Sequence, residues 1–321
     1  MRAILEATGA RALRRGPRIQ SLWSGYGEIR RATLVGDVTE AVVIKRVEPP
    51  TERRHPRGWS STRGHERKLR SYDVERAFYR DFAPRLDDRV RVARCLAAQR
   101  DERGWWFVLE DLDRAGFDLR REVASPDEVK ACLQWLAGFH AIFLGERPEG
   151  LWPVGTYWHL ATRPDELAAT EDPALVRAAP LLDARLSACR FPTVVHGDAK
   201  LANFCFSPEG AVAAVDFQYA GGGAGVKDVA YFLSSLSDVA MVEAEAEGYL
   251  DVYFRALRAA LAGRDVDLDA VEAEGRRLYP LAWADFVRFL AGWAPGHWKV
   301  NPYSRRMTRI ALDALELDET A

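Results

Sequence analysis

Three side chains that carry oxygen atoms follow one another in a pattern that suits phosphoryl transfer. Asp198 comes after the apolar run TVV, Asn203 lies five residues later, and Asp216 ends the apolar run AVAAV. The letters SPEG between NFCF and AVAAVDF predict a hairpin turn, which brings Asn203 and Asp216 to one end of the hairpin, close to Asp198. Magnesium prefers oxygen ligands, and phosphoryl transfer needs a residue that orients the attacking hydroxyl. The pattern therefore predicts Asp198 as the catalytic base and Asn203 and Asp216 as metal ligands.

Each of these residues alone also has an ordinary structural explanation. HGD fits a loop turn, Asn203 a cap, and Asp216 a carboxylate at the end of a strand. The whole string HGDxxxxN, with VDFQ downstream, is far more specific and favours the catalytic interpretation. Lys200, two residues after Asp198, is a second catalytic candidate, because a cation there can offset charge on the transferring phosphoryl group. A solvated lysine explains Lys200 equally well.

The string HGDAKLAN…VDFQ resembles the catalytic segment of the aminoglycoside phosphotransferase and choline kinase-like superfamily, which is related to protein kinases with their pattern HRDxxxxN…DFG. The resemblance implies a kinase that uses ATP and Mg2+ and moves the γ-phosphoryl group to a hydroxyl of a small molecule. Gly197 and Gln218 depart from the protein-kinase pattern, as is usual in the small-molecule branch. The segments FVLEDL, HGDAKLANF and KDVAYFLSS are most similar in style to the ecdysteroid kinase-like branch. Asp228, in the last segment, resembles a family aspartate that caps a helix and braces the catalytic loop.

A kinase also needs a strand lysine that holds the nucleotide phosphates and a helix carboxylate that fixes this lysine. Lys45 ends the apolar run AVVIK, which is similar to the kinase VAIK element, and Glu75 in the next expected helix matches the partner glutamate. A glycine loop, SGYGEI, resembles the phosphate-covering turn, although a plain hairpin fits the same letters. LEDL resembles the hinge whose backbone meets adenine. The candidates in these two segments are Gly25, Tyr26, Gly27, Glu110, Asp111 and Leu112.

The hydrophobic pattern predicts the elements that position these residues. Strands are expected at 19–23, 28–34, 39–47, 90–99 and 105–109, with a β-rich island at 193–219. Helices are expected at 72–82, 126–145, 228–236, 239–262, 269–294 and 304–317. With the resemblance, this order predicts an α+β protein-kinase-like fold with two lobes. The small β-rich N-lobe, 1–111, is expected to bind the nucleotide, and the helical C-lobe, 112–321, to hold the catalytic loop and the acceptor site.

The composition is that of a soluble globular protein, with 48% hydrophobic and 29% charged residues among 321. The net charge of −2 hides a basic first part, because residues 1–100 hold 23 Lys and Arg against 12 Asp and Glu. No zinc finger, RNP pattern or basic helix accompanies this charge, so we do not expect a nucleic-acid partner. No apolar run is long enough for a membrane span, and the start reads as an amphipathic arm or frayed end rather than a secretory signal. Four scattered cysteines without a CxxC pair fit a cytoplasmic protein.

Two further features concern the small-molecule acceptor. The basic stretch 52–70 is a solvated loop by composition, yet His55, Trp59 and His65 are unusual there and leave open a structured flap over nucleotide or acceptor. Aromatic residues in the C-terminal helices suit a flat or apolar alcohol or a cationic amine, although core packing explains most of them. The aromatic residues are Trp283, Phe286, Trp293 and Trp298, and the same segment carries Asp285.

Three alternatives to a metabolic kinase stay open. An antibiotic-modifying phosphotransferase has the same motifs and differs only in its substrate. A catalytically inactive kinase-like module that only binds nucleotide is disfavoured, since Lys45, Asp198, Asn203 and Asp216 are all intact. An enzyme that transfers AMP instead of phosphate uses similar metal ligands. The acceptor and the oligomeric state are not readable from these residues.

Overall fold

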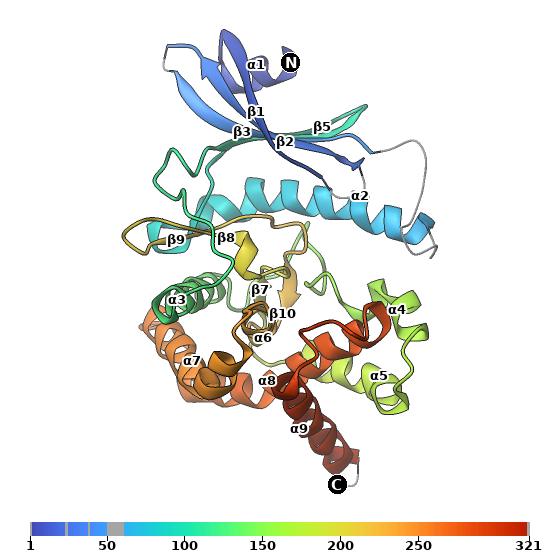
Figure 1. The fold of residues 1–321 in the computed structure, drawn as a ribbon. Helices are drawn as coiled ribbons and strands as arrows, with labels where there is room; N and C mark the ends of the chain where they lie inside the picture. The colour runs from blue at the N-terminus through green and yellow to red at the C-terminus, as the bar shows by residue number, and fades with distance from the viewer. Residues whose placement is uncertain (1, 23–24, 38, 50–60, 320–321) are drawn as a thin grey trace. The chain divides into compact units, whose positions relative to one another are not determined.

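The computed structural model describes residues 2–22, 25–37, 39–49 and 61–319. The chain divides into two compact units, the first formed by Met1–Arg120 with Cys205–Val215 and the second by Arg121–Phe204 with Asp216–Ala321 (Figure 1). The first unit contains a five-stranded sheet, and the second is mostly helical. The α+β class expected from the sequence is therefore confirmed. The assignment of nucleotide binding to 1–111 and of acceptor binding to 112–321 stays a prediction.

The sheet of the first unit is antiparallel throughout, and its strand order is β1-β2-β3-β6-β5. Its strands are β1 (Ala12–Ser21), β2 (Gly27–Val35), β3 (Glu40–Val47), β6 (Gly104–Glu110) and β5 (Cys95–Asp101). Side chains alternate between the two faces of a strand. Val42 and Ile44 pack in one cluster with Ile4 of α1 (Arg2–Thr8). Lys45 therefore points to the opposite face, along which α2 (Ser61–Ala77) runs (Figure 1).

One expectation for this unit fits in part, and another is wrong in extent. The start of the chain, expected as an amphipathic arm or frayed end, forms the helix α1 with Ile4 buried, as an amphipathic arm would. The second half of the basic stretch, expected as a loop, belongs to α2, because its Glu, Arg, Lys and Leu residues are good helix formers. His55 and Trp59 lie outside the described residues, so the flap stays a prediction.

The helix expected over 72–82 and the predicted hairpin both have counterparts in the structure. Val74, Phe78 and Phe82 are buried on one side of α2 and of the π-helical turn Phe78–Phe82 that continues it. Two 3-10 turns follow, Ala83–Arg85 and Asp88–Val90. The hairpin strands β8 (Phe204–Phe206) and β9 (Val212–Ala214) join β4 (Arg91–Val92) in a three-stranded sheet of order β4-β9-β8. Gly210 N donates to Ser207 O over 3.0 Å and closes the predicted SPEG turn.

The second unit contains all of the helices that the pattern predicts for it, and two more. Its helices are α3 (Pro126–Ile142), α4 (Pro164–Ala168), α5 (Pro173–Ser187), α6 (Val226–Ser234), α7 (Val239–Ala260), α8 (Leu268–Trp293) and α9 (Pro302–Glu319). A 3-10 turn, Leu160–Thr162, precedes α4, and another, Leu201–Asn203, precedes β8. Ser125 and Glu128 form a capping box at the start of α3. α5 was missed because Pro180 lies inside it and proline normally ends a helix.

The helices of this unit surround a short ladder that leads to the catalytic loop. β7 (Thr193–Val195) pairs antiparallel with β10 (Gly221–Gly223). α3 packs on α7, while α8 packs on α5, α6 and α9. β7 ends immediately before His196, so the ladder fixes where the segment HGD begins.

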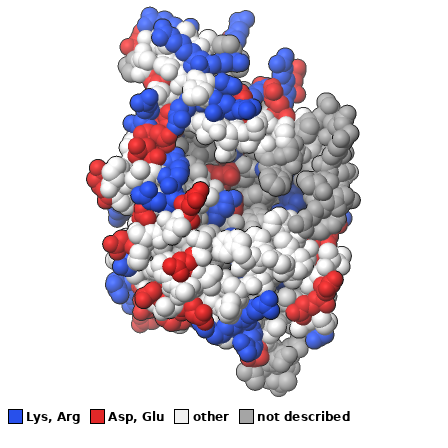
Figure 2. Space-filling view, in the orientation of Figure 1, with Lys and Arg blue, Asp and Glu red and all other residues white. Residues whose placement is uncertain are grey.

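The surface charge follows the asymmetry of the sequence. Figure 2 shows Lys and Arg gathered on the visible face of the first unit, and a mixture of both signs on that of the second. Many of these charges are paired on the surface, such as Arg46 with Asp101 at 2.8 Å. Over the described ranges, no helix is long and apolar enough to cross a membrane.

The turn between β1 and β2 offers a test of its geometry. Gly27 has φ +135°, and a Cβ there would lie 2.0 Å from the carbonyl oxygen of Arg46, whereas Gly25 has φ +75° and nothing within 4 Å. We expect Gly27→Ala to lower the free energy of unfolding by about 3 kcal/mol or more, because strain and overlap add. Gly25→Ala should lower the free energy of unfolding by only about 1 kcal/mol, because the left-handed backbone conformation is its single cost. Denaturant unfolding of both variants checks this, and equal losses would contradict the turn described here.

Candidate active site

Asp198 is held in one orientation by three side chains of the second unit. Its Oδ2 accepts from Lys200 Nζ over 3.0 Å and from Asn203 Nδ2 over 3.1 Å. Its Oδ1 accepts from the hydroxyl of Tyr231, on α6, over 3.1 Å. Asp198 is only 7% exposed, so these donors provide much of the stabilisation that water would otherwise give the carboxylate. The structure thus brings together three of the residues predicted from the sequence and adds Tyr231.

The backbone of the catalytic loop is held from behind by a second carboxylate, Asp228 on α6. Asp228 is fully buried and accepts from His196 N over 2.5 Å and from Gly197 N over 2.9 Å. His140 Nε2 lies 3.1 Å from the same carboxylate. Asp228 is in the first turn of α6, where the helix dipole favours a negative charge. The predicted bracing role therefore agrees with its contacts, while the N-cap position itself belongs to Gly225.

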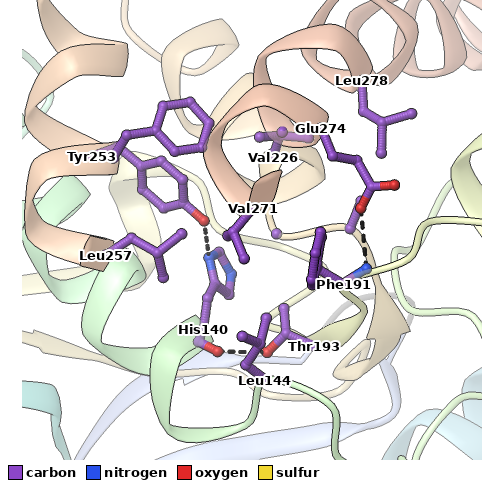
Figure 3. A pocket seen from close by; sticks show the side chains of 14 residues that line it. His140, Leu144, Phe191, Thr193, Val226, Tyr253, Leu257, Val271, Glu274 and Leu278 are labelled. Carbon is purple, nitrogen blue, oxygen red and sulfur yellow. Dashed lines mark hydrogen bonds between the residues drawn. The ribbon is translucent and has the colours of Figure 1, made fainter. Parts of the chain in front are cut away.

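His140 connects this brace to the helices around it. Its Nδ1 lies 2.9 Å from the hydroxyl of Tyr253 on α7, and its backbone carbonyl accepts from Thr193 Oγ1 over 2.8 Å (Figure 3). When Nε2 of the neutral ring donates to Asp228, Nδ1 accepts the tyrosine proton. The chain of contacts therefore runs from α7 through α3 to the catalytic loop.

Gly197 is required by the shape of the loop. Its φ is +77°, and a Cβ would lie 2.0 Å from the carbonyl oxygen of Tyr219. Both the left-handed backbone and the close approach exclude a larger residue. The glycine of HGD thus has a local steric cause.

The predicted metal ligands have oxygen atoms suited to Mg2+. Both donor contacts of Asn203 Nδ2 go to Asp198, to Oδ2 and to the backbone oxygen at 2.8 Å, which leaves the amide oxygen as a ligand. Asp216 has φ +70°, an unusual conformation for a residue other than glycine, and its Oδ1 accepts from Gln218 Nε2 over 2.6 Å. One amide and one carboxylate oxygen fit Mg2+, which retains water and phosphate ligands. Across the described ranges there is no group of three or more His, Cys, Asp or Glu arranged for a metal ion.

Lys200 interacts electrostatically with two of the predicted site carboxylates, Asp198 and Asp216. Burial lowers the pKa of Lys200, but the negative charges of Asp198 and Asp216 outweigh it and raise the pKa above the ordinary lysine value. Lys200 is therefore a permanent cation at neutral pH. The Lys200 side chain is 37% exposed, and its catalytic role stays a prediction.

In the first unit, Lys45 and Glu75 form a buried ion pair. Lys45 Nζ donates to both Glu75 oxygens, over 2.8 and 2.7 Å, and the two residues are 4% and 1% exposed. The ammonium also lies 5.7 Å from the ring centroid of Tyr72. The predicted pairing of this strand lysine with the helix glutamate is therefore present in the structure. That Lys45 binds nucleotide phosphates stays a prediction.

The predicted glycine loop is a turn between β1 and β2 that is tied to α2. Gly25 N donates to Leu22 O over 3.2 Å, and Leu22 N donates to Gly27 O over 2.8 Å. Tyr26 is 8% exposed, and its hydroxyl lies 2.6 Å from His65 Nδ1 on α2. His65 of the basic stretch is therefore next to the predicted loop, a contact that the sequence did not indicate.

The predicted hinge has its side chains engaged within the first unit. Glu110 accepts from Arg91 over 2.7 Å, and Asp111 accepts from Arg31 over 3.1 Å. Desolvation raises the pKa of Glu110, but the hydrogen bond from Arg91 and further donors outweigh it and keep the pKa below its ordinary value. The backbone oxygen of Leu112 accepts from Phe117 N over 2.8 Å. Adenine recognition by this segment stays a prediction.

The aromatic residues expected near the acceptor separate into two groups. Phe286 joins a cluster with Trp158, Tyr231 and Phe289, with Trp293 packed against it. Trp283 instead lies in the core, with its ring centroid 5.2 Å from that of Tyr303 on α9. Asp285 is also structural, since it accepts from Trp158 Nε1 over 3.0 Å and from Arg288 over 2.6 Å.

Two residues of the site were missed by sequence reasoning. Tyr231 lies three residues after Asp228, so both project from one side of α6, and this spacing could have indicated it. Lys299 lies in the loop between α8 and α9, with Nζ 4.5 Å from the ring centroid of Tyr231. No motif or periodicity marks a single lysine in a loop.

Comparison with known protein families identifies a family for the chain. Residues 33–265 match the phosphotransferase enzyme family. The chain belongs to this family. The predicted relationship to aminoglycoside phosphotransferases is thereby confirmed, while the closer likeness to choline kinase and to the ecdysteroid kinase-like branch stays a prediction. A search of the curated proteins finds no match.

Solved structures share the fold of this phosphotransferase over nearly its whole length. The microcompartment-associated aminopropanol kinase is 14% identical, with 99% of this chain and 95% of that chain covered and a TM-score of 0.50. An amicoumacin kinase in complex with AMP-PNP, Ca2+ and Ami is 14% identical, with 99% and 93% covered and a TM-score of 0.51. The likeness confirms the protein-kinase-like α+β fold.

Variants of the buried Lys45–Glu75 ion pair separate its contribution to stability from a contribution to ATP binding. Lys45→Met removes the ammonium that donates to both Glu75 oxygens, and we expect a loss of about 3–5 kcal/mol in the free energy of unfolding. Lys45→Met combined with Glu75→Leu removes both charges and should recover most of this loss. If Lys45 binds phosphates, the double variant stays folded but loses ATP binding, measured by thermal unfolding with and without ATP. Lys130→Met, at an exposed pair with Asp127, is the control and should change neither property.

The brace of the catalytic loop makes a second prediction. Asp228→Asn places an amide where two backbone N–H groups and His140 need an acceptor, so we expect a loss of about 3 kcal/mol or more in stability. Amide hydrogen exchange at His196 and Gly197 should become faster than in the wild type. Asp251→Asn, at a partly exposed pair with Arg276, is the matched control. Unchanged exchange at the two amides in a folded Asp228→Asn protein would show that another contact holds the loop.

Proposed function

We propose that this phosphotransferase is an ATP- and Mg2+-dependent kinase that transfers the γ-phosphoryl group to a hydroxyl of a small molecule. The observation that carries the proposal is the Asp198 carboxylate, oriented by Lys200, Asn203 and Tyr231 in a loop whose backbone is braced from behind. A carboxylate fixed in this way is suited to orient a hydroxyl and to accept its proton. Membership of the family supports the same reaction class.

Each residue of the site has a separate task in this proposal. Asp198 orients the acceptor hydroxyl and takes its proton, and Lys200 offsets negative charge on the transferring group. Asn203 and Asp216 hold Mg2+, which supplies neutralisation of phosphate charge when it is bound. Lys45, fixed by Glu75, holds nucleotide phosphates. The glycine loop and the hinge are proposed to cover the phosphates and to meet adenine.

A small molecule is the acceptor that the known structures favour. The neighbours with the same fold are named as kinases of aminopropanol and of amicoumacin. Trp298 is 49% exposed and lies beside Lys299, whose ammonium also contacts Tyr231, the hydroxyl donor to Asp198. An inactive nucleotide-binding module and an enzyme that transfers AMP have no specific observation in their favour, and they serve as outcomes of the test.

Nucleotide binding and product mass test the proposal together. We expect ATP with Mg2+ to raise the melting temperature of the wild type, since binding to the folded state stabilises it by about 2.7 kcal/mol at 100 times the Kd. Asp216→Ala should lose the Mg2+-dependent part of the shift. Asp198→Asn should keep the shift and lose about 10²- to 10⁴-fold in kcat.

The outcomes separate the three functions. A product heavier by one phosphoryl group supports the kinase, and one heavier by AMP supports nucleotidyl transfer. A Mg2+-dependent shift without any product across a broad alcohol panel favours the inactive module. No shift at millimolar ATP in a folded protein contradicts the proposal.

A further inference from the structure

Lys299 is a cation in an aromatic environment beside the catalytic base. Its Nζ lies 4.5 Å from the ring centroid of Tyr231, 5.4 Å from that of Phe286 and 5.7 Å from that of Trp298. Tyr231 donates its hydroxyl to Asp198 Oδ1, so one tyrosine side chain connects the ammonium with the base. Within the described part of the chain, the Lys299 ammonium makes no hydrogen bond and no ion pair.

The charges around Lys299 do not compensate for its burial. Desolvation lowers the pKa of Lys299 to about 8, with Asp198 acting to raise it and Lys200 acting to lower it. Asp198 cannot serve as a full counter-ion, because Lys200, Asn203 and Tyr231 already donate to its oxygens. Aromatic faces stabilise an ammonium by about 0.5–2 kcal/mol, which is less than the penalty for an unpaired charge taken out of water.

An anionic ligand would complete this environment. A carboxylate or phosphate next to Lys299 gains charge-assisted hydrogen bonds from an ammonium that has no other acceptor. Trp298 is 49% exposed and offers a flat apolar surface next to the ammonium. A polycationic substrate would instead bring its ammonium groups close to both Lys200 and Lys299, and like charges repel.

We propose that Lys299 binds a carboxylate or phosphate of the acceptor, so that the substrate is a hydroxylated anion with an apolar body and not a polycationic aminoglycoside. The inference rests on the proposed function and deepens it, because it assigns the charge of the acceptor. Lys299 is then a specificity-determining residue, and the hydroxyl to be phosphorylated lies at Asp198.

Benzyl alcohols whose second substituent is anionic, neutral or cationic test the inference. The probes are 4-(hydroxymethyl)benzoate, 1,4-benzenedimethanol and 4-(aminomethyl)benzyl alcohol, which are an anion, a neutral molecule and a cation at pH 7. Their dissociation constants are measured by titration calorimetry on the full chain with AMP-PNP and Mg2+ present. We expect the anion to bind about 10-fold tighter than the neutral probe, and the cation to bind weakest. A fourth probe, 4-(hydroxymethyl)phenyl phosphate, decides between carboxylate and phosphate.

Variants show whether Lys299 causes the preference. Lys299→Met should bind the anionic and neutral probes equally, Lys299→Arg should keep the preference, and the control Lys130→Met should match the wild type. A purely structural role would weaken all probes together and would not change their ratio.

Two sets of outcomes overturn the inference. The first is equal or reversed affinities in the wild type, including no binding of either anion at millimolar concentration. The second is an anion preference that survives in a folded Lys299→Met protein. AMP-PNP binding, measured in the same samples, distinguishes failure of this inference from failure of the proposed function. Loss of nucleotide binding by the wild type rejects the kinase itself, whereas nucleotide binding without an anion preference rejects only the role of Lys299.

Discussion

The buried carboxylate of Asp228 is the interaction on which the catalytic loop depends. A carboxylate without exposed surface needs donors for its oxygens, and the segment HGD supplies two backbone N–H groups while His140 lies beside it. The same contacts give those amides acceptors that no regular strand or helix provides. The Asp228 carboxylate therefore fixes both the shape of the loop and its position against α6. The Asp198 side chain consequently has a fixed orientation before any ligand binds.

Fixed direction matters because phosphoryl transfer relies on positioning and electrostatics more than on covalent chemistry. Asp198 receives donors on both oxygens, from Tyr231 on one side and from Lys200 and Asn203 on the other. These contacts restrict rotation of the carboxylate. They also keep its charge balanced in a site where water is scarce, so that little reorganisation is left for the reaction itself.

The parts of the site that were predictable are those that short-range patterns encode. The spacing of Asp198, Asn203 and Asp216 around a hairpin is local, and alternation along β3 places Lys45 opposite Ile44. The partnership of Tyr231 with Asp198 spans 33 residues, and the helix spacing from Asp228 was its only signal. The position of Lys299 depends on how the loop after α8 packs, which no periodicity records. α5 was not predicted for another reason, because it contains Pro180 and proline normally ends a helix.

The two unusual lysines of the helical unit show why Lys299 differs from a structural charge. Lys227 is 2% exposed, and burial lowers its pKa, but Asp285 lies 3.8 Å away and Asp183 also acts to raise that pKa. Carboxylates of the fold thus act on the charge of Lys227, but burial still outweighs them. Lys299 keeps some accessible surface and has aromatic rings where Lys227 has carboxylates. Within the described residues, the fold gives Lys227 carboxylate neighbours but pairs none with the Lys299 ammonium beside Tyr231, so the proposed anion of the substrate can pair with it there.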